Sequence, residues 1–407
     1  AFGKSIKITL INPKAQTLEE LYGLMDPVTR DWTDGILSNA FRNMNMPLPL
    51  GKENEMRWLI FDGDVDALWI ENMNSVMDDN KLLTLPNGER IQLKDYSKLI
   101  METFDLQYAS PATISRCGMV WVAPEDLGVR PYYERWVNMR PENERQLLMA
   151  SYDVFVPKMV EWVLTGMVEG EVRPKPEMVV PLNDLGMIVQ LCNLLESILA
   201  DAMAAAKASE DGSGSEGYDD NDIEGVFIFA LTWSLGGVLH GNSRPMFDSF
   251  LRELATGSTP SDSVYDSFYD LVEKRWKLWQ TRVHDYVQPV PFNFSQIIVP
   301  TSDNVLYSFL LETVCNSGRP VLFVGEPGTA KTVTVENYMK NVLPKATSIP
   351  LTINFSSRTS GKDVRQNIED ATDKRTGRIY GPPTGKRLYC FIDDMNMPKV
   401  DSYGTQQ

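Results

Sequence analysis

The chain has 407 residues, enough for two or three domains with hydrophobic cores of their own. Its net charge of −16 argues against a broad nucleic-acid-binding surface, and no apolar run reaches the roughly 18 residues that span a bilayer. Four cysteines without Cys-x-x-Cys spacing and only two histidines argue against a disulfide framework, a zinc site and histidine chemistry. The start "AFGKSIKITLINP" has neither an initiator Met nor a signal-peptide pattern, so we expect the chain to be part of a longer one.

The first informative element is a predicted strand from Trp58 to Phe61, an apolar run that ends in Asp62. An acid at the tip of a buried strand is typical of a carboxylate that binds Mg²⁺ beside a nucleotide. The next position, where an acid that activates water would stand, is Gly63, and glycine cannot polarise water. Asp64 and Asp66 lie farther along, beyond the strand tip. The alternative interpretation is an acidic loop that holds no nucleotide.

Arg116 follows in "ASPATISRCGMVWV", between a short helical stretch and a strand-like run. One arginine among small residues is more often a surface or salt-bridged side chain. The position within the module favours a second interpretation, an arginine finger that reaches the γ-phosphate of a neighbouring module.

The middle of the chain changes to helical patterns. Residues 184–208 have the length and apolar spacing of a helix, and residues 226–254 predict two more helices, broken near Gly236–Gly237 and at Pro245. The acidic, Gly/Ser-rich stretch 209–222 predicts a mobile loop.

Two further segments complete the middle region. The basic cluster at 273–284 has the spacing of a helix face, which predicts a solvated or interdomain helix, with a phosphate-binding patch as the alternative. The proline-punctuated stretch 287–294 predicts a linker.

A phosphate loop follows a predicted strand, Val321 to Val324, and opens a predicted helix, which is the context of a Walker A motif. Backbone N–H groups at a helix N-terminus cradle phosphates, while the loop lysine reaches the β- and γ-phosphates and the hydroxyl after it binds Mg²⁺. The common pattern has Gly where this chain has Ala330, a residue small enough to permit close approach of the backbone. The predicted nucleotide-binding residues are Gly325, Glu326, Pro327, Gly328, Thr329, Ala330, Lys331 and Thr332, with Val299 and Pro300 beside the adenine.

A second strand ending in acid, "RLYCFIDD", supplies the matching carboxylate. Asp393 is the predicted Mg²⁺ ligand together with Thr332, and Asp62 has the corresponding role in the earlier module. Asp394 stands where a glutamate usually orients the attacking water. Its side chain is one methylene shorter than glutamate, so we expect binding with slow or conditional hydrolysis.

The two acid-ended strands belong to an internal repeat. Each follows a β-rich run that ends in asparagine, at Asn12 and at Asn354, and a stretch with helical spacing. The period is about one domain, so the chain would begin inside one module, after its phosphate loop, and end inside the next.

Together these segments resemble the dynein heavy chain over nearly the whole sequence. The resemblance rests on "NPKAQTLEELYG", "WTDGIL", "WLIFDGDVDALWIENMNSVMDDNK", "ASPATISRCGMVW", "GEPGTAKT", "INFSSRT", "YGPPTGKR" and "FIDDMNMPKVDSYGTQQ". "FIDDMNMP", with Asp in place of Glu, is similar to the axonemal type, and "INFSSRT" to an inner-arm chain. Asp64 departs from the proline usual in that family.

The resemblance implies an α/β fold of P-loop AAA+ modules, parallel sheets flanked by helices, with an all-helical lid between them. Residues 1–123 would be the C-terminal part of the second module's α/β core and 124–285 its lid. Residues 286–407 would be the N-terminal part of the third module. We refer to residues 1–285 as the N-terminal module and to residues 286–407 as the C-terminal module.

The resemblance also implies function. The second module would hold ATP without turnover, the third would bind ATP or ADP with Mg²⁺ and gate the motor, and Arg116 would serve the preceding module. Other AAA+ modules of the same chain, dynein intermediate and light chains, and microtubules contacted through a stalk elsewhere would be the partners, in the axoneme of a cilium or flagellum. Neither nucleic acid nor membrane is expected. The alternatives are a structural segment whose nucleotides are permanent spacers, and another single-chain AAA+ ring such as a midasin-like remodelling ATPase.

Overall fold

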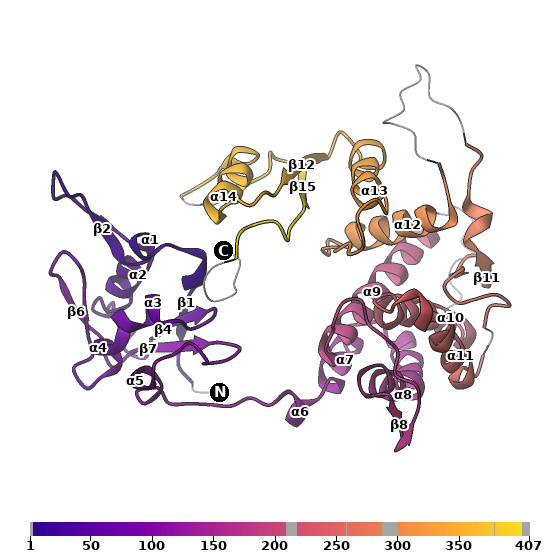
Figure 1. The fold of residues 1–407 in the computed structure, drawn as a ribbon, viewed down its shortest axis with the longest axis horizontal. Helices are drawn as coiled ribbons and strands as arrows, with labels where there is room; N and C mark the ends of the chain where they lie inside the picture. Colours follow the sequence, from indigo (N-terminus) through magenta and orange to yellow (C-terminus); the bar gives the residue numbers. More distant parts are fainter. Residues whose placement is uncertain (1–2, 209–217, 258, 287–298, 378, 401–407) are drawn as a thin grey trace. The chain divides into compact units, whose positions relative to one another are not determined.

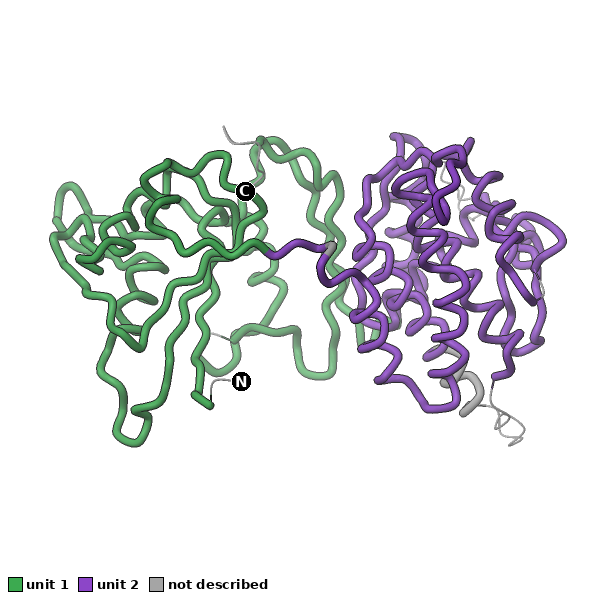
Figure 2. The backbone as a smooth tube through the Cα atoms, turned by 90° about the horizontal axis from the view of Figure 1, so that it is seen from below, with its two compact units in different colours: residues 1–121, 344–407 green, residues 122–343 purple. Residues whose placement is uncertain are grey.

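The computed structural model describes residues 3–208, 218–257, 259–286, 299–377 and 379–400 (Figure 1). The chain divides into two compact units, residues 1–121 with 344–407 and residues 122–343, which Figure 2 distinguishes by colour. None of the helices in the described ranges is both long and apolar enough to cross a membrane.

The first unit contains a parallel sheet of β1 (Ile6–Ile11), β4 (Met56–Asp62) and β7 (Ser97–Glu102), in the order β1-β4-β7. The middle strand β4 confirms the strand predicted over 58–61, and Asp62 is its last residue. Side chains alternate between the two faces of a strand, and on one face of β4 Leu59 and Phe61 are fully buried. They share a core with Leu37 and Phe41 of α2 (Ile36–Met44).

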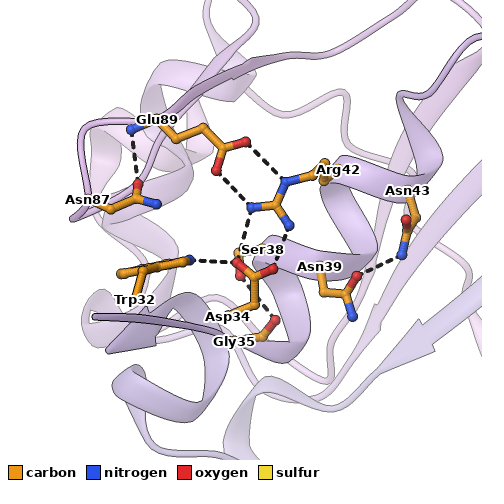
Figure 3. A network of polar contacts seen from close by, with 9 residues as sticks. All are labelled: Trp32, Asp34, Gly35, Ser38, Asn39, Arg42, Asn43, Asn87 and Glu89. Carbon is orange, nitrogen blue, oxygen red and sulfur yellow. Dashed lines mark hydrogen bonds and ion pairs between the residues drawn. The ribbon is translucent and has the colours of Figure 1, made fainter. Parts of the chain in front are cut away.

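The connections between these strands carry short helices and two hairpins. The helices are α1 (Leu18–Tyr22), α3 (Ala67–Ile70), α4 (Asn74–Met77) and α5 (Pro111–Ile114), and the hairpins are β2–β3 (Gly23–Met25, Trp32–Asp34) and β5–β6 (Leu82–Thr84, Arg90–Gln92). Arg42 of α2 joins the hairpins, because its guanidinium pairs with Asp34 (2.6 Å) at the end of β3 and with Glu89 (2.7 Å) in the β5–β6 turn (Figure 3). These hydrogen bonds from Arg42 hold the pKa of both carboxyl groups below their usual range.

Residues 344–400 contribute a second parallel pair to the first unit. It consists of β12 (Ser348–Asn354) and β15 (Arg387–Asp393), and α14 (Gly361–Asp370) and the hairpin β13–β14 (Asp373–Lys374, Tyr380–Gly381) lie between them in the sequence. Asn354 is in register with Asp393. In the N-terminal sheet Ile11 is in register with Phe61, one residue before Asn12 and Asp62. Both copies of the predicted repeat therefore place an asparagine-ended strand beside an aspartate-ended one.

The second unit is mainly helical. Its helices are α6 (Pro124–Leu127), α7 (Arg130–Val137), α8 (Glu142–Thr165), α9 (Asp184–Ala208), α10 (Asp220–Leu231), α11 (Arg244–Leu254), α12 (Ser302–Asn316) and α13 (Lys331–Asn337). Side chains such as Phe155 of α8, Leu195 of α9 and Phe227 of α10 meet in one core. The helix predicted over 184–208 is confirmed as α9. The two helices predicted within 226–254 are α10 and α11, and Pro245 lies in the first turn of α11, where a helix tolerates proline.

The helical region also carries two short hairpins, β8–β9 (Met167–Val168, Glu171–Val172) and β10–β11 (Ser267–Asp270, Arg275–Leu278). The helix predicted over 273–284 is therefore wrong: this segment forms β11 and then a 3₁₀ turn, Trp279–Arg282. The basic residues of β11 alternate with Trp276 and Leu278 at the period of a strand. Lys277 fixes the hairpin by pairing with Asp270 on β10 (2.7 Å).

The acidic stretch 209–222 is only partly a loop. Residues 209–217, like the predicted linker 287–294, lie outside the described residues. Residues 220–222 form the first turn of α10, so the loop prediction is wrong for them. The reason is local: the Asp219 side chain accepts a hydrogen bond from the Asp222 N–H (2.9 Å) and caps the helix.

Two runs predicted as strands do not pair in the described part of the chain. Val321 to Val324 is extended without a ladder partner, and Leu322 and Val324 are exposed. The run Met119 to Val122 is also unpaired and largely exposed. A strand exists only through hydrogen bonds to a neighbour, so an apolar run alone does not produce one.

Helix α12 packs into the core of the helical region 124–285. Leu306 is buried with the side chains of this region, and the ring of Phe309 lies 5.3 Å from that of Trp279. Three residues past the end of α12, Arg319 pairs with Glu196 of α9 (3.1 Å). The first helix of the C-terminal module is thus part of the hydrophobic core of the helical region that precedes it.

Candidate functional site

The predicted phosphate loop is an exposed turn between α12 and α13. Lys331, the first residue of α13, folds back over the loop: its Nζ donates to the carbonyl oxygens of Gly325 (2.8 Å) and Glu326 (2.5 Å) and lies 3.1 Å from Thr329 Oγ1. The ammonium group is therefore inside the turn, where a phosphate cradled by the loop would meet it. Gly328 has φ +81° and nothing within 4 Å of where a Cβ would stand, so the loop is open above this residue.

Ala330 adopts a left-handed conformation, with φ +61°. Glycine visits this region freely, whereas a residue with a Cβ is strained there. The sequence predicts that the small side chain of Ala330 permits close approach of the backbone. The backbone shows another reason for the usual glycine, because the turn into α13 requires positive φ at this position.

The predicted metal ligands Thr332 and Asp393 fall in different units, Thr332 as the second residue of α13 and Asp393 at the end of β15. Within its own unit Asp393 is fixed by the register with Asn354, and its Oδ1 accepts the backbone N–H of Asp394 (3.0 Å). Asp394 also has positive φ, +55°, so its side chain leaves a tight turn directly after the strand. Among the described residues no cluster of three or more His, Cys, Asp or Glu suits a metal ion.

The N-terminal module has the equivalent strand tip, with Asp62 exposed at its end. Gly63 has φ +158°, and a Cβ on it would stand 2.8 Å from Asn12 Oδ1 and 3.4 Å from Pro13 Cδ. Asn12 is itself held, since its Oδ1 accepts the N–H of Lys14 (2.9 Å). The position that usually carries the catalytic acid is therefore filled from the side by the loop after β1.

Asp66 has a structural role. It is 2% exposed, caps α3 by accepting the N–H of Leu68 (2.8 Å), and pairs with Lys14 Nζ (2.6 Å). The ion pair joins the loop after β1 to the loop after β4. Asp66 is thus unavailable for activating water, as the sequence analysis expects from its distance from the strand tip.

Arg116 lies just past α5 and is held in place. Its Nε donates to Asp78, at the end of α4, and its Nη1 donates to the carbonyl of Ala112 (2.7 Å). The hydrogen bond that the guanidinium donates to Asp78 raises the pKa of Arg116. The structure therefore contains the salt bridge of the first interpretation, while the side chain remains 29% exposed, as the second requires.

The predicted adenine contacts, Val299 and Pro300, precede α12. Val299 is 58% exposed, and Thr301 caps α12 by accepting the N–H of Asn304 (3.2 Å). An exposed apolar side chain at the entry to the module is compatible with stacking on a base.

Three family models match successive parts of the chain. They are an AAA domain of the dynein-related subfamily over residues 3–117, the dynein heavy chain AAA lid domain over 152–281, and a P-loop containing dynein motor region over 286–407. The chain belongs to the dynein heavy-chain family.

Axonemal dynein heavy chains match the whole sequence. It is 48% identical to the dynein-1-alpha heavy chain of the flagellar inner arm I1 complex of Chlamydomonas reinhardtii, over 100% of this chain and 9% of that protein. It is 44% identical to human dynein axonemal heavy chain 10 over the same shares, and 35% identical to human dynein axonemal heavy chain 3 over 99% of this chain and 10% of that protein. The chain thus spans about a tenth of these dyneins. The resemblance to an axonemal dynein heavy chain is confirmed, and a midasin-like ring is not favoured.

Sequence patterns did not reveal the contacts that three residues make at these dynein sites: Asn12, Asp78 and Lys14. Each acts through a partner distant in the chain, and the only available signal was their place in the quoted motifs "NPKAQ" and "NSVMDDNK".

Proposed function

We propose that this segment is the nucleotide-holding part of the motor ring of an axonemal dynein heavy chain, running from the second AAA+ module into the third. The observation that carries the proposal is the phosphate loop, whose lysine ammonium lies against the loop carbonyls of Gly325 and Glu326. An ammonium held in such a turn is placed to meet a nucleotide phosphate. Residues 1–123, 124–285 and 286–407 are the proposed core, lid and following module, and the matches at 3–117, 152–281 and 286–407 support these boundaries.

In the C-terminal module the ligand is ATP or ADP with Mg²⁺. Backbone N–H groups from Gly325 to Lys331 would bind the phosphates, Lys331 would neutralise them, and Thr332 and Asp393 would hold the metal ion, which supplies charge neutralisation. The residues fit this ligand, because Gly328 leaves the loop open and the donor set is a hydroxyl and a carboxylate. Asp394 would orient water from its tight turn, with one methylene less reach than glutamate, so this site turns over slowly and regulates the motor.

The N-terminal module would hold its nucleotide without hydrolysis. Asp62 keeps the metal carboxylate, while Gly63 offers no group to orient water and is closed in by Asn12. An acid or base positioned on the attacking water typically contributes 10²–10⁴ in rate, which this site lacks. Arg116 would act outside its own module, on the γ-phosphate held by the preceding one.

For the whole protein we propose ATP-driven movement towards microtubule minus ends in the axoneme of a cilium or flagellum. The partners would be the other AAA+ modules of the same chain, dynein intermediate and light chains, and microtubules bound through a stalk elsewhere in the heavy chain. The names of the relatives, axonemal and flagellar dyneins, support the location.

The test is Lys331→Ala in the full-length heavy chain. We expect nucleotide at this site to be lost and microtubule release to slow, because the charge that faces the phosphates is removed. Lys340→Ala is the matched control, since Lys340 is 68% exposed and forms its ion pair with Glu336, one helical turn away. Unchanged nucleotide content and motility in Lys331→Ala would refute the proposal.

A further inference from the structure

Two segments of the chain, around α4 and around α5, are joined by side-chain hydrogen bonds between residues 38 and 39 positions apart. Asn74 begins α4, and Asp78 follows directly after its end, four residues later. Thr113 of α5, which is 2% exposed, donates from Oγ1 to Asn74 Oδ1 (3.2 Å). Arg116 Nε donates to Asp78 Oδ1.

The contacts leave one edge of the guanidinium available. Arginine has five N–H donors in a planar fork. Nε is bound to Asp78 and Nη1 to the Ala112 carbonyl (2.7 Å), while Nη2 makes no hydrogen bond within the described part of the chain. The guanidinium plane is thus fixed by one carboxylate and one carbonyl, and the remaining edge has the geometry for a phosphoryl oxygen.

We infer that Asp78 is a positioning residue for Arg116. Asp78 holds the guanidinium, and Asn74 anchors α5, so that the Nη2 edge faces the phosphate of a nucleotide bound by the preceding module. The inference rests on the proposed role of Arg116. A flexible arginine must lose several rotamers when it engages the transition state, whereas a fixed one does not. The carboxylate therefore contributes through orientation, and its charge is secondary.

The test compares Asp78→Ala, Asp78→Asn and Arg116→Ala in the intact heavy chain, measured by steady-state ATPase activity. An arginine finger is typically worth 10³–10⁵ in kcat, so Arg116→Ala should lower kcat about 10³-fold or more. Asp78→Ala should lower kcat about tenfold with KM unchanged, because the finger acts on the transition state. Asp78→Asn keeps an Oδ1 acceptor and should restore most of the loss.

Asp79→Ala is the matched control, since Asp79 is the next residue, is exposed and carries the same charge. The double variant Asp78→Ala/Arg116→Ala should be no slower than Arg116→Ala, because Asp78 acts only through the arginine. If Arg116→Ala slows the ATPase but Asp78→Ala does not, or Asp78→Ala raises the rate, the positioning role is wrong. If Arg116→Ala leaves the ATPase unchanged, the finger assignment itself fails.

Discussion

Restoring an acid at position 63 should not make the N-terminal module hydrolyse ATP. In Gly63→Glu the new Cβ would stand 2.8 Å from Asn12 Oδ1, against about 3.4 Å for an ordinary contact. Asn12 must retreat by about 0.6 Å, which disturbs its 2.9 Å hydrogen bond from the Lys14 N–H. The backbone adds strain, since φ +158° is rarely adopted by residues with a Cβ.

The cost can be estimated from these two effects. A lost hydrogen bond of this type is worth about 1 kcal/mol, and a strained backbone conformation about 1–3 kcal/mol. The substitution should therefore destabilise the loops after β1 and β4 by roughly 2–4 kcal/mol. A glutamate at 63 would thus displace the strand tip that carries Asp62.

Hydrogen–deuterium exchange of the intact heavy chain measures this locally. Peptides covering residues 8–20 and 56–66 should exchange at least about 30-fold faster in both Gly63→Glu and Gly63→Ala, as about 2 kcal/mol of local opening requires. Gly118→Ala is the control, because a Cβ there meets nothing within 4 Å and its φ is unstrained. Single-turnover assays should find ATP at this site unhydrolysed. Hydrolysis in Gly63→Glu with unchanged exchange would show that chemistry, and not space, limits the site.

Two further predictions follow from backbone strain and from charge. Ala330→Gly should relieve the φ +61° conformation and stabilise the turn into α13 by about 1 kcal/mol, so the peptide covering residues 325–337 should exchange about fivefold more slowly; unaltered exchange would contradict the strain argument. Arg42→Ala should destabilise the two hairpins by about 1 kcal/mol at pH 7, as measured by hydrogen–deuterium exchange. This figure is small because both ion pairs are partly exposed and therefore screened by solvent. Arg42 lowers the pKa of Asp34 and Glu89. The two ion pairs therefore stabilise the hairpins fully above the usual carboxyl pKa near 4, and this contribution is lost as the pH falls through the lowered pKa values. The variant should therefore match the parent at low pH, and a difference that persists there would refute the ion-pair explanation.

The parts of the fold that could be predicted are those set by local pattern. The strand that ends in Asp62, the strand that ends in Asp393 and the helix α9 each carry their periodicity within a dozen or two dozen residues. The helix prediction for residues 273–284 was wrong because it rested on the spacing of four positive charges, whereas the alternation of Trp276 and Leu278 with basic residues indicates a strand. The run at 321–324 failed because strand formation depends on partners distant in sequence.

The site was predictable only as a set of residue types. Nothing near Gly63 in the sequence indicates that Asn12 lies against it, 51 positions earlier, and nothing near Arg116 indicates Asp78. Such contacts depend on the order of strands in the sheet, which places loops distant in sequence at the same edge. Ala330 is a similar case, since the sequence shows an alanine at this position but does not show that its φ is positive.

The packing of α12 into the lid bears on how such a chain can be divided, in the laboratory and in evolution. Leu306 and Phe309 complete a core that also contains Phe229 and Trp279. A fragment ended at the sequence boundary near residue 285 would leave those aromatic rings open to water and invite aggregation. A self-contained piece must extend through Asn316, the last residue of α12. By the same reasoning, the N-terminal module cannot be copied or removed cleanly at residue 285, because its helical region takes part of its interior from α12.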